Sequence, residues 1–381
     1  MEELRMRAHA RLVGALCIAA ILSACGGGGG AGGTRSSIPA TLSTAVATAL
    51  PATQVQLVAT NLAGQQRSDG GILYTSTQIN PYFANIAATG AVHGGVDFIN
   101  VQQWMQWYVA HSTAPNPWSL PGAITDYNVA SNGALSSTGS ADSVDSYAAT
   151  FITLAAAASR EGSPQLRAYV AGLHTSIELI ASVIDAVTDA DGLTWALPTY
   201  KEKYLMDNSE VYHGLVDLAY LRSQVYGDAA GSMRASAHAL QIQASIGSEM
   251  WSASLNQFAV ALDNGGLTWP QAGNWQDAAS QLFPILHGVI APASPPAQSA
   301  YAQFSAEFPG WPSLQKPDEY PWADIAFVAL VMNDVSRATT YASSVQQQYS
   351  PGFAYPWYCA ESGWYIRILD GLITPLTVAN L

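Results

Sequence analysis

The sequence predicts an all-α fold, an (α/α)6 toroid in which six helical hairpins close into an inner and an outer ring. Three observations support this prediction. Only 11% of the 381 residues are charged and 49% are hydrophobic, whereas roughly a quarter of an ordinary soluble domain is charged. Alanine-rich segments with a helical apolar period dominate, and alternating β-branched runs are few. Nearly all-apolar helices also alternate with amphipathic ones, as expected if the apolar helices pack on every side in an inner ring.

The predicted inner helices share the same kind of first turn. Each follows a loop rich in Gly, Pro, Asn, Asp or Ser and opens with acids and an aromatic residue before an apolar run. The segments begin near Gly95, Asp142, Asp207, Trp275, Asp318 and Glu361. The predicted outer helices lie over 163–187, 229–252, 295–308 and 335–348, with one more within 38–62. A plain α-solenoid is the alternative, but we find no fixed repeat of roughly 34 to 45 residues.

The N-terminus has the pattern of a bacterial lipoprotein signal. Three arginines precede an apolar run over 12–22, which is far short of the roughly 20 residues needed to cross a bilayer. The run ends in Leu-Ser-Ala-Cys, which resembles a lipobox, so we expect cleavage before Cys25 and lipidation of that residue. Gly26 rather than an aspartate follows the cysteine, which favours the outer membrane. An ordinary secretory signal is the alternative.

These features divide the chain into a signal peptide over 1–24, a lipidated and glycine-rich tether over 25–37, and a toroid domain over 38–381. The only cysteine expected in the folded domain is Cys359, so no internal disulfide is expected. The chain holds 27 acids against 14 Lys and Arg, a formal charge of −13, which argues against nucleic acid as a partner. No HxH, HExxH or CxxC pattern occurs, so we expect no metal and no cofactor.

Three stretches of the sequence resemble the six-hairpin glycosidase superfamily. They are ITDY at 124–127, DSVDSYAAT at 142–150 and YLMDNSEVY at 204–212. The resemblance covers most of 80–375 and implies the (α/α)6 toroid. It also implies that the loops before the inner helices build a cleft for a sugar chain, which paired carboxylates cut.

The acids at the predicted inner-helix starts are the candidate catalytic residues. They are Asp97, Asp142, Asp145, Asp207, Glu210, Asp277, Asp318, Glu319 and Glu361. Helix capping explains one acid per helix, at about 0.3–1 kcal/mol each. Asp142 and Asp145 lie on one helix face, and so do Asp207 and Glu210. Like charges this close reduce stability, so the second acid of each pair indicates a function beyond capping.

Glycoside hydrolysis needs two carboxyls, and a separation of roughly 6.5–9.5 Å gives inversion. We therefore predict an inverting hydrolase of a poly- or oligosaccharide, with one carboxylate from Asp126 or Asp145 and one from Asp207 or Glu210. Asp145 and Asp207 are preferred. Which of the two is the acid depends on burial, which the sequence does not give.

Aromatic side chains near these starts are candidate sugar-binding residues, because the C–H faces of sugars lie flat on rings. The predicted binding residues are Tyr147, Trp104, Tyr212, His213, Trp275, Trp322 and Trp364, with Glu361 as a further carboxylate. Core packing is the alternative for Trp104, and helix capping is the alternative for Glu361.

Two other functions stay open at this point. One is a polysaccharide lyase or related uronate-processing enzyme, which needs Arg or Lys side chains to neutralise a uronate carboxylate. The basic residues near the predicted helix starts are few, and each has an acid close by. The other is a non-catalytic glycan-binding lipoprotein that kept the toroid, since fold alone does not fix function. In each case contact with the membrane is expected through the lipid anchor only.

Overall fold

The structure is a computed structural model that describes residues 40–95 and 99–374. The chain divides into two compact units, Met1–Leu50 and Pro51–Leu381, and the fold and site below belong to the second. Within the described residues, no helix is long and apolar enough to cross a membrane. The predicted signal peptide, Cys25, the tether and Asp97 lie outside the described residues.

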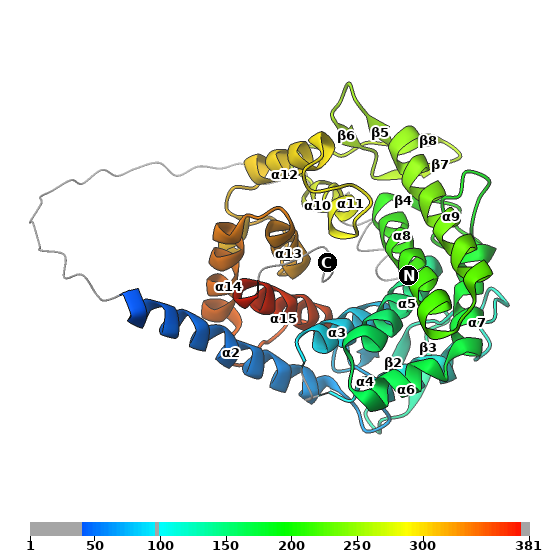
Figure 1. The fold of residues 1–381 in the computed structure, drawn as a ribbon, viewed down its shortest axis with the longest axis horizontal. Helices are drawn as coiled ribbons and strands as arrows, with labels where there is room; N and C mark the ends of the chain where they lie inside the picture. The colour runs from blue at the N-terminus through cyan, green and yellow to red at the C-terminus, as the bar shows by residue number, and fades with distance from the viewer. Residues whose placement is uncertain (1–39, 96–98, 375–381) are drawn as a thin grey trace, which may run out of the picture. The chain divides into compact units, whose positions relative to one another are not determined.

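The second unit is a ring of helical hairpins (Figure 1). The inner helices are α3 (Pro81–His93), α5 (Val144–Glu161), α8 (Leu205–Tyr220), α10 (Trp275–Ser280) followed by α11 (Phe283–Leu286), α13 (Ala323–Val331) and α15 (Cys359–Ile373). The outer helices are α2 (Ala40–Gln65), of which the part from Pro51 on belongs to this unit, α4 (Val101–Ser112), α6 (Pro164–Ala171) with α7 (His174–Ala186), α9 (Ala229–Ser245), α12 (Pro295–Glu307) and α14 (Val335–Tyr349). Short π-helical turns, Leu221–Val225 and Ile246–Met250, continue α8 and α9. The sequence prediction of an all-α toroid is therefore confirmed.

The inner ring is closed, because each inner helix contacts the next and α15 contacts α3. The closing contact is made by two glycines, Gly90 on α3 and Gly363 on α15. A Cβ atom on either glycine would collide with the backbone of the facing helix. Close approach of two helix backbones is a position that only glycine tolerates. The first and last hairpins of the ring are thus held in direct contact.

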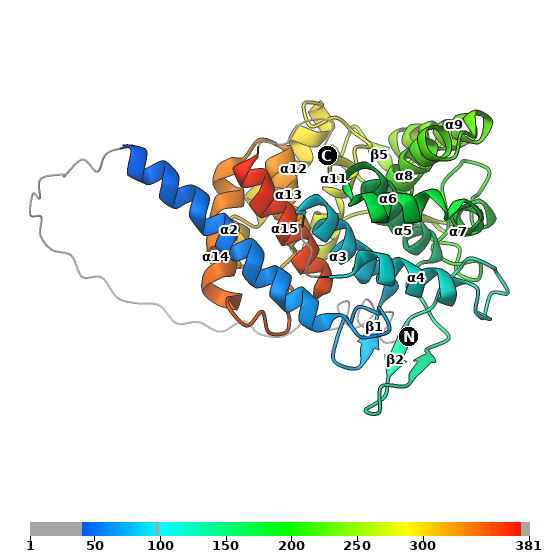
Figure 2. The ribbon, with the colours of Figure 1, turned by 60° about the horizontal axis from the view of Figure 1, so that its bottom comes forward.

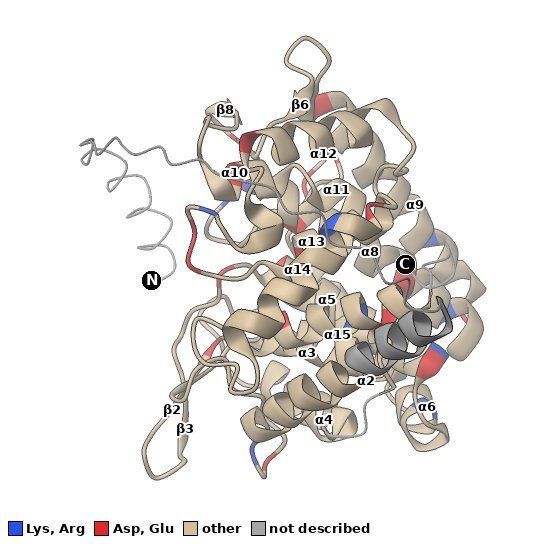
Figure 3. Cartoon of the chain, turned by 90° about the vertical axis from the view of Figure 1, so that its left-hand side faces the viewer, with Lys and Arg blue, Asp and Glu red and all other residues tan. Residues whose placement is uncertain are grey.

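Burial on all sides explains the low charge content of the sequence. In α13 every residue is buried except Asp324 and Val331. Inner helices of this kind have no solvated face, so they carry no polar stripe. The charges are spread thinly over the rest of the molecule (Figure 3).

The prediction for the first inner helix is wrong. The segment after Gly95 forms α4, which packs against α3 and α6 as an outer helix. The inner helix of that hairpin is α3, which begins with Pro81 and has no acid in its first turn. Since the prediction relied on acids at helix starts, it passed over α3 in favour of the next apolar segment.

Other boundaries differ in smaller ways. The predicted outer helix over 163–187 is split by Gly172 into α6 and α7, and the segment from Trp275 is split into α10 and α11. The helix predicted from Asp318 begins only at Ala323, so Asp318 and Glu319 lie in the preceding loop.

Short antiparallel strands lie in the loops between the helices, and Figure 2 shows β1 and β2 together below α3 and α4. The first sheet has the order β1-β2-β3, and β1 leads directly into α3. The second sheet has the order β4-β7-β8, and β4 leads directly into α8. A third sheet pairs β5 with β6. The strands are β1 (Gln78–Ile79), β2 (Tyr127–Val129), β3 (Leu135–Ser137), β4 (Lys203–Tyr204), β5 (Trp251–Ser252), β6 (Gln257–Phe258), β7 (Ala261–Asp263) and β8 (Gly266–Thr268).

Candidate active site

Five carboxyl groups come from the first two turns of four inner helices. We call them the acid cluster: Asp145 of α5, Asp207 and Glu210 of α8, Asp324 of α13, and Glu361 of α15. Burial raises the pKa of Glu210 and that of Glu361. The charges of Asp145 and Asp324 raise the pKa of Glu210 further, and the charge of Asp324 raises that of Glu361. The convergence of helix starts at one end of a closed ring is what brings these acids together.

Glu210 of α8 is a buried carboxyl with a strongly raised pKa. Its side chain is 4% exposed, and the hydroxyl of Tyr82 on α3 donates a hydrogen bond to its Oε1 atom. Burial raises the pKa of Glu210 to about 8, and the Tyr82 hydrogen bond offsets part of the rise. A carboxyl with this pKa holds its proton at pH 7 and can donate it.

Asp324 faces the same group of residues from α13. Its side chain is partly exposed, and its Oδ1 atom accepts the backbone N–H of Ile325 at 2.9 Å. Burial raises the pKa of Asp324 to about 7, while the charge of Lys316 lowers it. The charge of Asp324 also raises the pKa of Tyr82. Sequence reasoning missed this residue because it placed the helix start at Asp318.

Asp145 is fully buried, with 0% of its side chain exposed. The Thr194 hydroxyl donates to its Oδ2 atom at 2.6 Å, and the Ser146 N–H donates to its Oδ1 atom at 2.9 Å. Burial raises the pKa of Asp145 to about 6. Because both oxygens already accept hydrogen bonds within the protein, we assign Asp145 to fixing the Thr194 loop beside α8. Asp207 is also buried, and its charge raises the pKa of Tyr82.

Glu361 caps a neighbouring helix. Its Oε1 atom accepts the N–H of Trp322 at 3.0 Å, and its Oε2 atom accepts the N–H of Ala323 at 2.7 Å. Trp322 has a φ of 59°, in the left-handed region that costs about 1 kcal/mol or more for a residue with a side chain. Burial raises the pKa of Glu361 to about 8. The capping alternative therefore holds, but the helix that is capped is α13 rather than α15.

Asp126 is connected to the acid cluster through Tyr147 and Tyr82. The Tyr147 hydroxyl donates to Asp126 Oδ1 at 2.9 Å and accepts from Asn80 Nδ2 at 2.8 Å. The Tyr147 ring is 6.0 Å from the ring of Tyr82. Tyr147 is buried, so it joins α5 to the start of α3 and to the β1-β2-β3 sheet and offers little ring surface to a ligand.

A chain of aromatic rings leads from the surface to Glu210, and we call it the aromatic row. It consists of Tyr355, Tyr320, Tyr358, Tyr74, Phe83 and Tyr82. Successive ring centroids are 6.1 Å apart for Tyr355–Tyr320, 5.8 Å for Tyr320–Tyr358, 4.7 Å for Tyr358–Phe83 and 5.3 Å for Phe83–Tyr82. Tyr355, at the outer end of the row, is 60% exposed. Tyr82, at the inner end, contacts Glu210. Rings of this kind offer faces to the C–H groups of sugars and hydroxyls to their edges.

The predicted aromatic binding residues have mixed positions. Trp104 is 0% exposed, and its indole N–H donates to Asn85 Oδ1 at 3.1 Å, so we assign it to the core. Trp275 is buried against Phe304. Trp322 is partly exposed next to the acid cluster, and its indole N–H donates to the carboxylate of Asp318. Tyr212 is partly exposed on α8.

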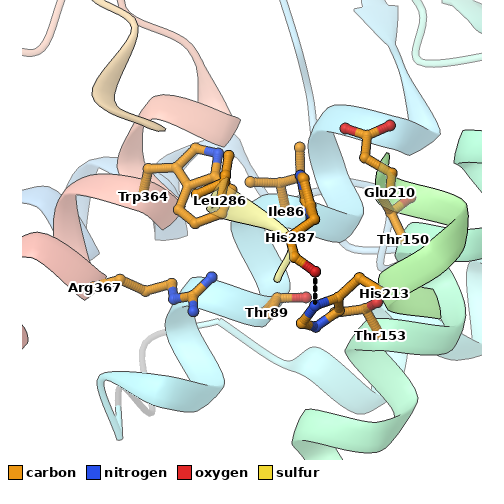
Figure 4. Close-up of a pocket in the computed structure, with 10 residues that line it drawn as sticks. All are labelled: Ile86, Thr89, Thr150, Thr153, Glu210, His213, Leu286, His287, Trp364 and Arg367. Atoms are coloured by element: carbon orange, nitrogen blue, oxygen red, sulfur yellow. Dashed lines mark hydrogen bonds between the residues drawn. The ribbon is translucent and has the colours of Figure 1, made fainter. Parts of the chain in front are cut away.

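His213 and Trp364 line a narrow cavity on the axis of the ring (Figure 4). The cavity has a volume of about 40 Å³ and runs from Glu210 to Arg367. His213 is held by Asp217, with Nε2 and Oδ2 3.3 Å apart, and by the carbonyl of His287. A polar space of this size holds about one to three water molecules and is too small for a sugar ring. His213 and Trp364 therefore line the same narrow cavity as Glu210.

The described residues contain no group of three or more His, Cys, Asp or Glu side chains arranged to hold a metal ion. Asp189 and Asp191 form a paired carboxylate turn, and the Lys203 ammonium occupies the space between them. Lys203 Nζ is 2.7 Å from Asp189 Oδ2 and 2.5 Å from Asp191 Oδ2. The positive charge that this turn binds is thus supplied by the protein itself.

No protein-family model matches the chain, and no curated protein matches its sequence. Solved structures match its fold. A glycosidase variant in complex with glucose has a TM-score of 0.60 at 13% identity, over 85% of this chain and 97% of that one. A reducing-end xylose-releasing exo-oligoxylanase has a TM-score of 0.53 at 14% identity, over 85% and 91%. A family GH78 rhamnosidase of Bacillus sp. GL1 has a TM-score of 0.54 at 14% identity, over 85% of this chain and 35% of that one. At these low sequence identities, the similarity to the solved structures shows that the fold is shared and shows nothing more.

Proposed function

We propose that this chain is a glycoside hydrolase that cleaves a neutral saccharide chain at the end of the ring where the inner helices begin. The observation that supports the proposal most directly is Glu210. It is a buried carboxyl with a pKa of about 8, it is contacted by a tyrosine hydroxyl, and acids from other inner helices surround it. Glycosidases need one carboxyl that stays protonated near neutral pH beside a second that is ionised.

In the proposed reaction Glu210 donates its proton to the glycosidic oxygen as the bond to the anomeric carbon breaks. Asp324 takes a proton from the water that attacks the same carbon from the opposite face, which inverts the anomeric centre. Asp324 is proposed as the base because its carboxyl is partly exposed and comes from another hairpin than Glu210. Asp207 is the second candidate for the base.

The lysines at this end of the ring favour a neutral substrate over a uronate. Lys316 donates to the backbone carbonyls of Asp318 and Tyr320. Lys203 lies between two carboxylates, and the Lys201 ammonium lies 3.9 Å from the centre of the Trp195 ring. Each of these cations is already engaged with protein groups. The aromatic row, by contrast, presents rings and hydroxyls that suit a neutral sugar chain.

The test is a reducing-sugar assay of the folded chain on a panel of neutral and uronate-containing polysaccharides. We expect release from a neutral chain with inverted anomeric configuration by NMR, and a loss of about 100-fold or more in kcat for Glu210→Gln. Asp324→Asn and Asp207→Asn identify the base. Glu249→Gln, an exposed acid on the π-helical turn after α9, is the matched control.

The outcomes separate the alternatives. Full activity of Glu210→Gln would reject its role as the acid. Unsaturated products from a uronate chain would identify a lyase instead. Saccharide binding without any release would identify a binding protein.

We also propose that the chain is a lipoprotein of the bacterial envelope, anchored at Cys25 in the outer membrane. The proposal rests on the lipobox-like sequence and on Gly26. Metabolic labelling with a radioactive fatty acid tests it. Wild type and Cys17→Ser should be labelled and should fractionate with outer membranes, whereas Cys25→Ser should not be labelled. Label on Cys25→Ser would contradict the assignment.

A further inference from the structure

A second pocket lies away from the acid cluster, between the outer helix α12, the short helix α10 with the loops on either side of it, and the β5–β6 hairpin. Figure 1 labels these elements. Its volume is about 160 Å³, against about 40 Å³ for the cavity beside Glu210. It is therefore the roomier of the two spaces and can take a larger ligand than an ion. Its polar lining consists of Asn256, Gln257, Gln271, Gln281, Gln303 and Glu307.

Most of the polar lining consists of side-chain amides. Within the described residues, the structure gives the amides of Gln257 and Gln271 no hydrogen-bond partner. Gln281 forms the floor, where its Oε1 atom accepts the N–H of Phe258 at 2.8 Å and its Nε2 atom donates to Ser280 at 3.4 Å. An amide nitrogen carries two hydrogens, so one hydrogen of Gln281 is left for a ligand.

The rest of the lining is held in position. Gln303 Nε2 donates to Ser299 Oγ at 3.0 Å, which leaves its carbonyl oxygen as an acceptor. Glu307 accepts the backbone N–H of Gly273, and this bond ties the end of α12 to the loop before α10. Phe304 and Ala300 supply the apolar wall.

We infer that this pocket is a second saccharide-binding site that takes one neutral sugar unit of a chain. Amides both donate and accept, which is what a hydroxyl group requires of its partners. The pocket is lined by one carboxylate and by no lysine or arginine, so it disfavours phosphates and uronates. The apolar wall suits the C–H groups of a sugar ring. The inference takes from the proposed function only the class of ligand and does not require the acid cluster to be catalytic.

The pocket adjoins the loop before α10 and the last two turns of α12, and aromatic contacts connect it to the acid cluster. Phe304 lines the pocket and packs on Trp275 at 5.1 Å between ring centroids. The Trp275 ring is in turn 6.2 Å from the ring of Trp322, which borders the acid cluster. One long chain bound at both places would gain avidity over a short one.

The test compares the double variant Gln257→Ala/Gln271→Ala with Gln347→Ala/Gln348→Ala, a pair of exposed glutamines on α14. Each pair is placed in the Glu210→Gln background, so that binding is measured without cleavage. The probes in native affinity electrophoresis are dextran, mixed-linkage β-glucan, arabinoxylan and mannan, with alginate as an anionic comparison. Melting temperatures confirm that each variant is folded.

We expect at least one neutral polysaccharide to retard the parent protein and the α14 control pair equally. The pocket variant should bind that polysaccharide at least fivefold more weakly. Equal retardation of the pocket variant, retardation by alginate alone, or no retardation by any probe would overturn the inference. Loss of cleavage by Glu210→Gln is measured separately, so hydrolysis and the second site can each fail without the other.

Discussion

Replacing Glu361 by alanine is expected to destabilise the fold strongly, because the Glu361 carboxyl caps α13 from a different helix. The substitution removes the acceptors of two backbone N–H groups, those of Trp322 and Ala323. The environment is buried, and an unsatisfied buried donor costs about 1–3 kcal/mol. Two such donors cost about 2–6 kcal/mol together and the lost packing of the side chain adds to this, so we expect a loss of about 3 kcal/mol or more. Trp322 also loses a contact that holds its left-handed backbone in place.

Urea unfolding followed by tryptophan fluorescence measures this change at constant m-value. Glu361→Gln keeps one carbonyl acceptor and should cost about 1–2 kcal/mol. The exposed loop residue Glu319 provides the control, and Glu319→Ala should stay within about 0.5 kcal/mol of wild type. A value for Glu361→Ala within about 1 kcal/mol of wild type would refute the capping interpretation and reopen a role of Glu361 at the substrate.

Three further predictions follow from the ring and the acid cluster. Gly90→Ala should lower the free energy of unfolding by about 3 kcal/mol or more, the upper end of the cost of overpacking, or prevent folding, because its methyl group meets the α15 backbone. The control is Gly64→Ala, whose added methyl group meets nothing within 4 Å, and it should be neutral or stabilising. Equal melting temperatures of the two variants would contradict the close contact between Gly90 and Gly363. Glu210, Asp324 and Glu361 have a pKa of about 7 to 8 in the folded chain, above their values in the unfolded chain. Each of them therefore contributes stability that is fully present below about pH 4 and is lost as the pH rises to about 8. The loss is up to about 1.4 kcal/mol per pH unit for each acid. The melting temperature should therefore fall from pH 6.5 to pH 8. Below pH 6.5 the lowered pKa of His93 has the opposite effect, because it makes stability rise with pH. A melting temperature that rises towards pH 8 would contradict the burial of these acids. Tyr82→Phe removes a hydrogen bond that lowers the pKa of Glu210, so the basic limb of the pH profile of kcat/KM should move to higher pH. A basic limb at the same pH as in wild type would show that Tyr82 does not influence the pKa of Glu210.

The all-α toroid could be predicted because inner and outer helices differ in composition. An inner helix such as α13 is apolar on all sides, whereas α14 carries exposed polar residues. The convergence of acids could also be predicted, because a closed ring brings the helix starts together. The sequence could not show which of α3 and α4 is the inner helix, because both are apolar segments after polar loops and only packing distinguishes them.

The roles within the site depend on burial and on contacts between distant segments. Glu361 caps a helix that begins 38 residues earlier in the sequence, and no local pattern predicts such a cap. The pKa values of Glu210 and Asp324 are raised by burial, which is a property of the folded ring. The aromatic row draws tyrosines from loops and helix starts far apart in the sequence, so no single motif revealed it.

The contact between Gly90 and Gly363 has a consequence for how the protein is made. During synthesis α15 emerges long after α3, so the most non-local contact of the ring forms last, and contacts of this kind slow folding. Until α15 docks, Tyr82 lacks the aromatic rings of the last hairpin and α13 lacks its Glu361 cap. A partly synthesised or truncated chain therefore has no assembled site, and activity should arise only with the completed ring. Under the proposed function, the growing polypeptide would gain activity on saccharides only when its last hairpin is in place.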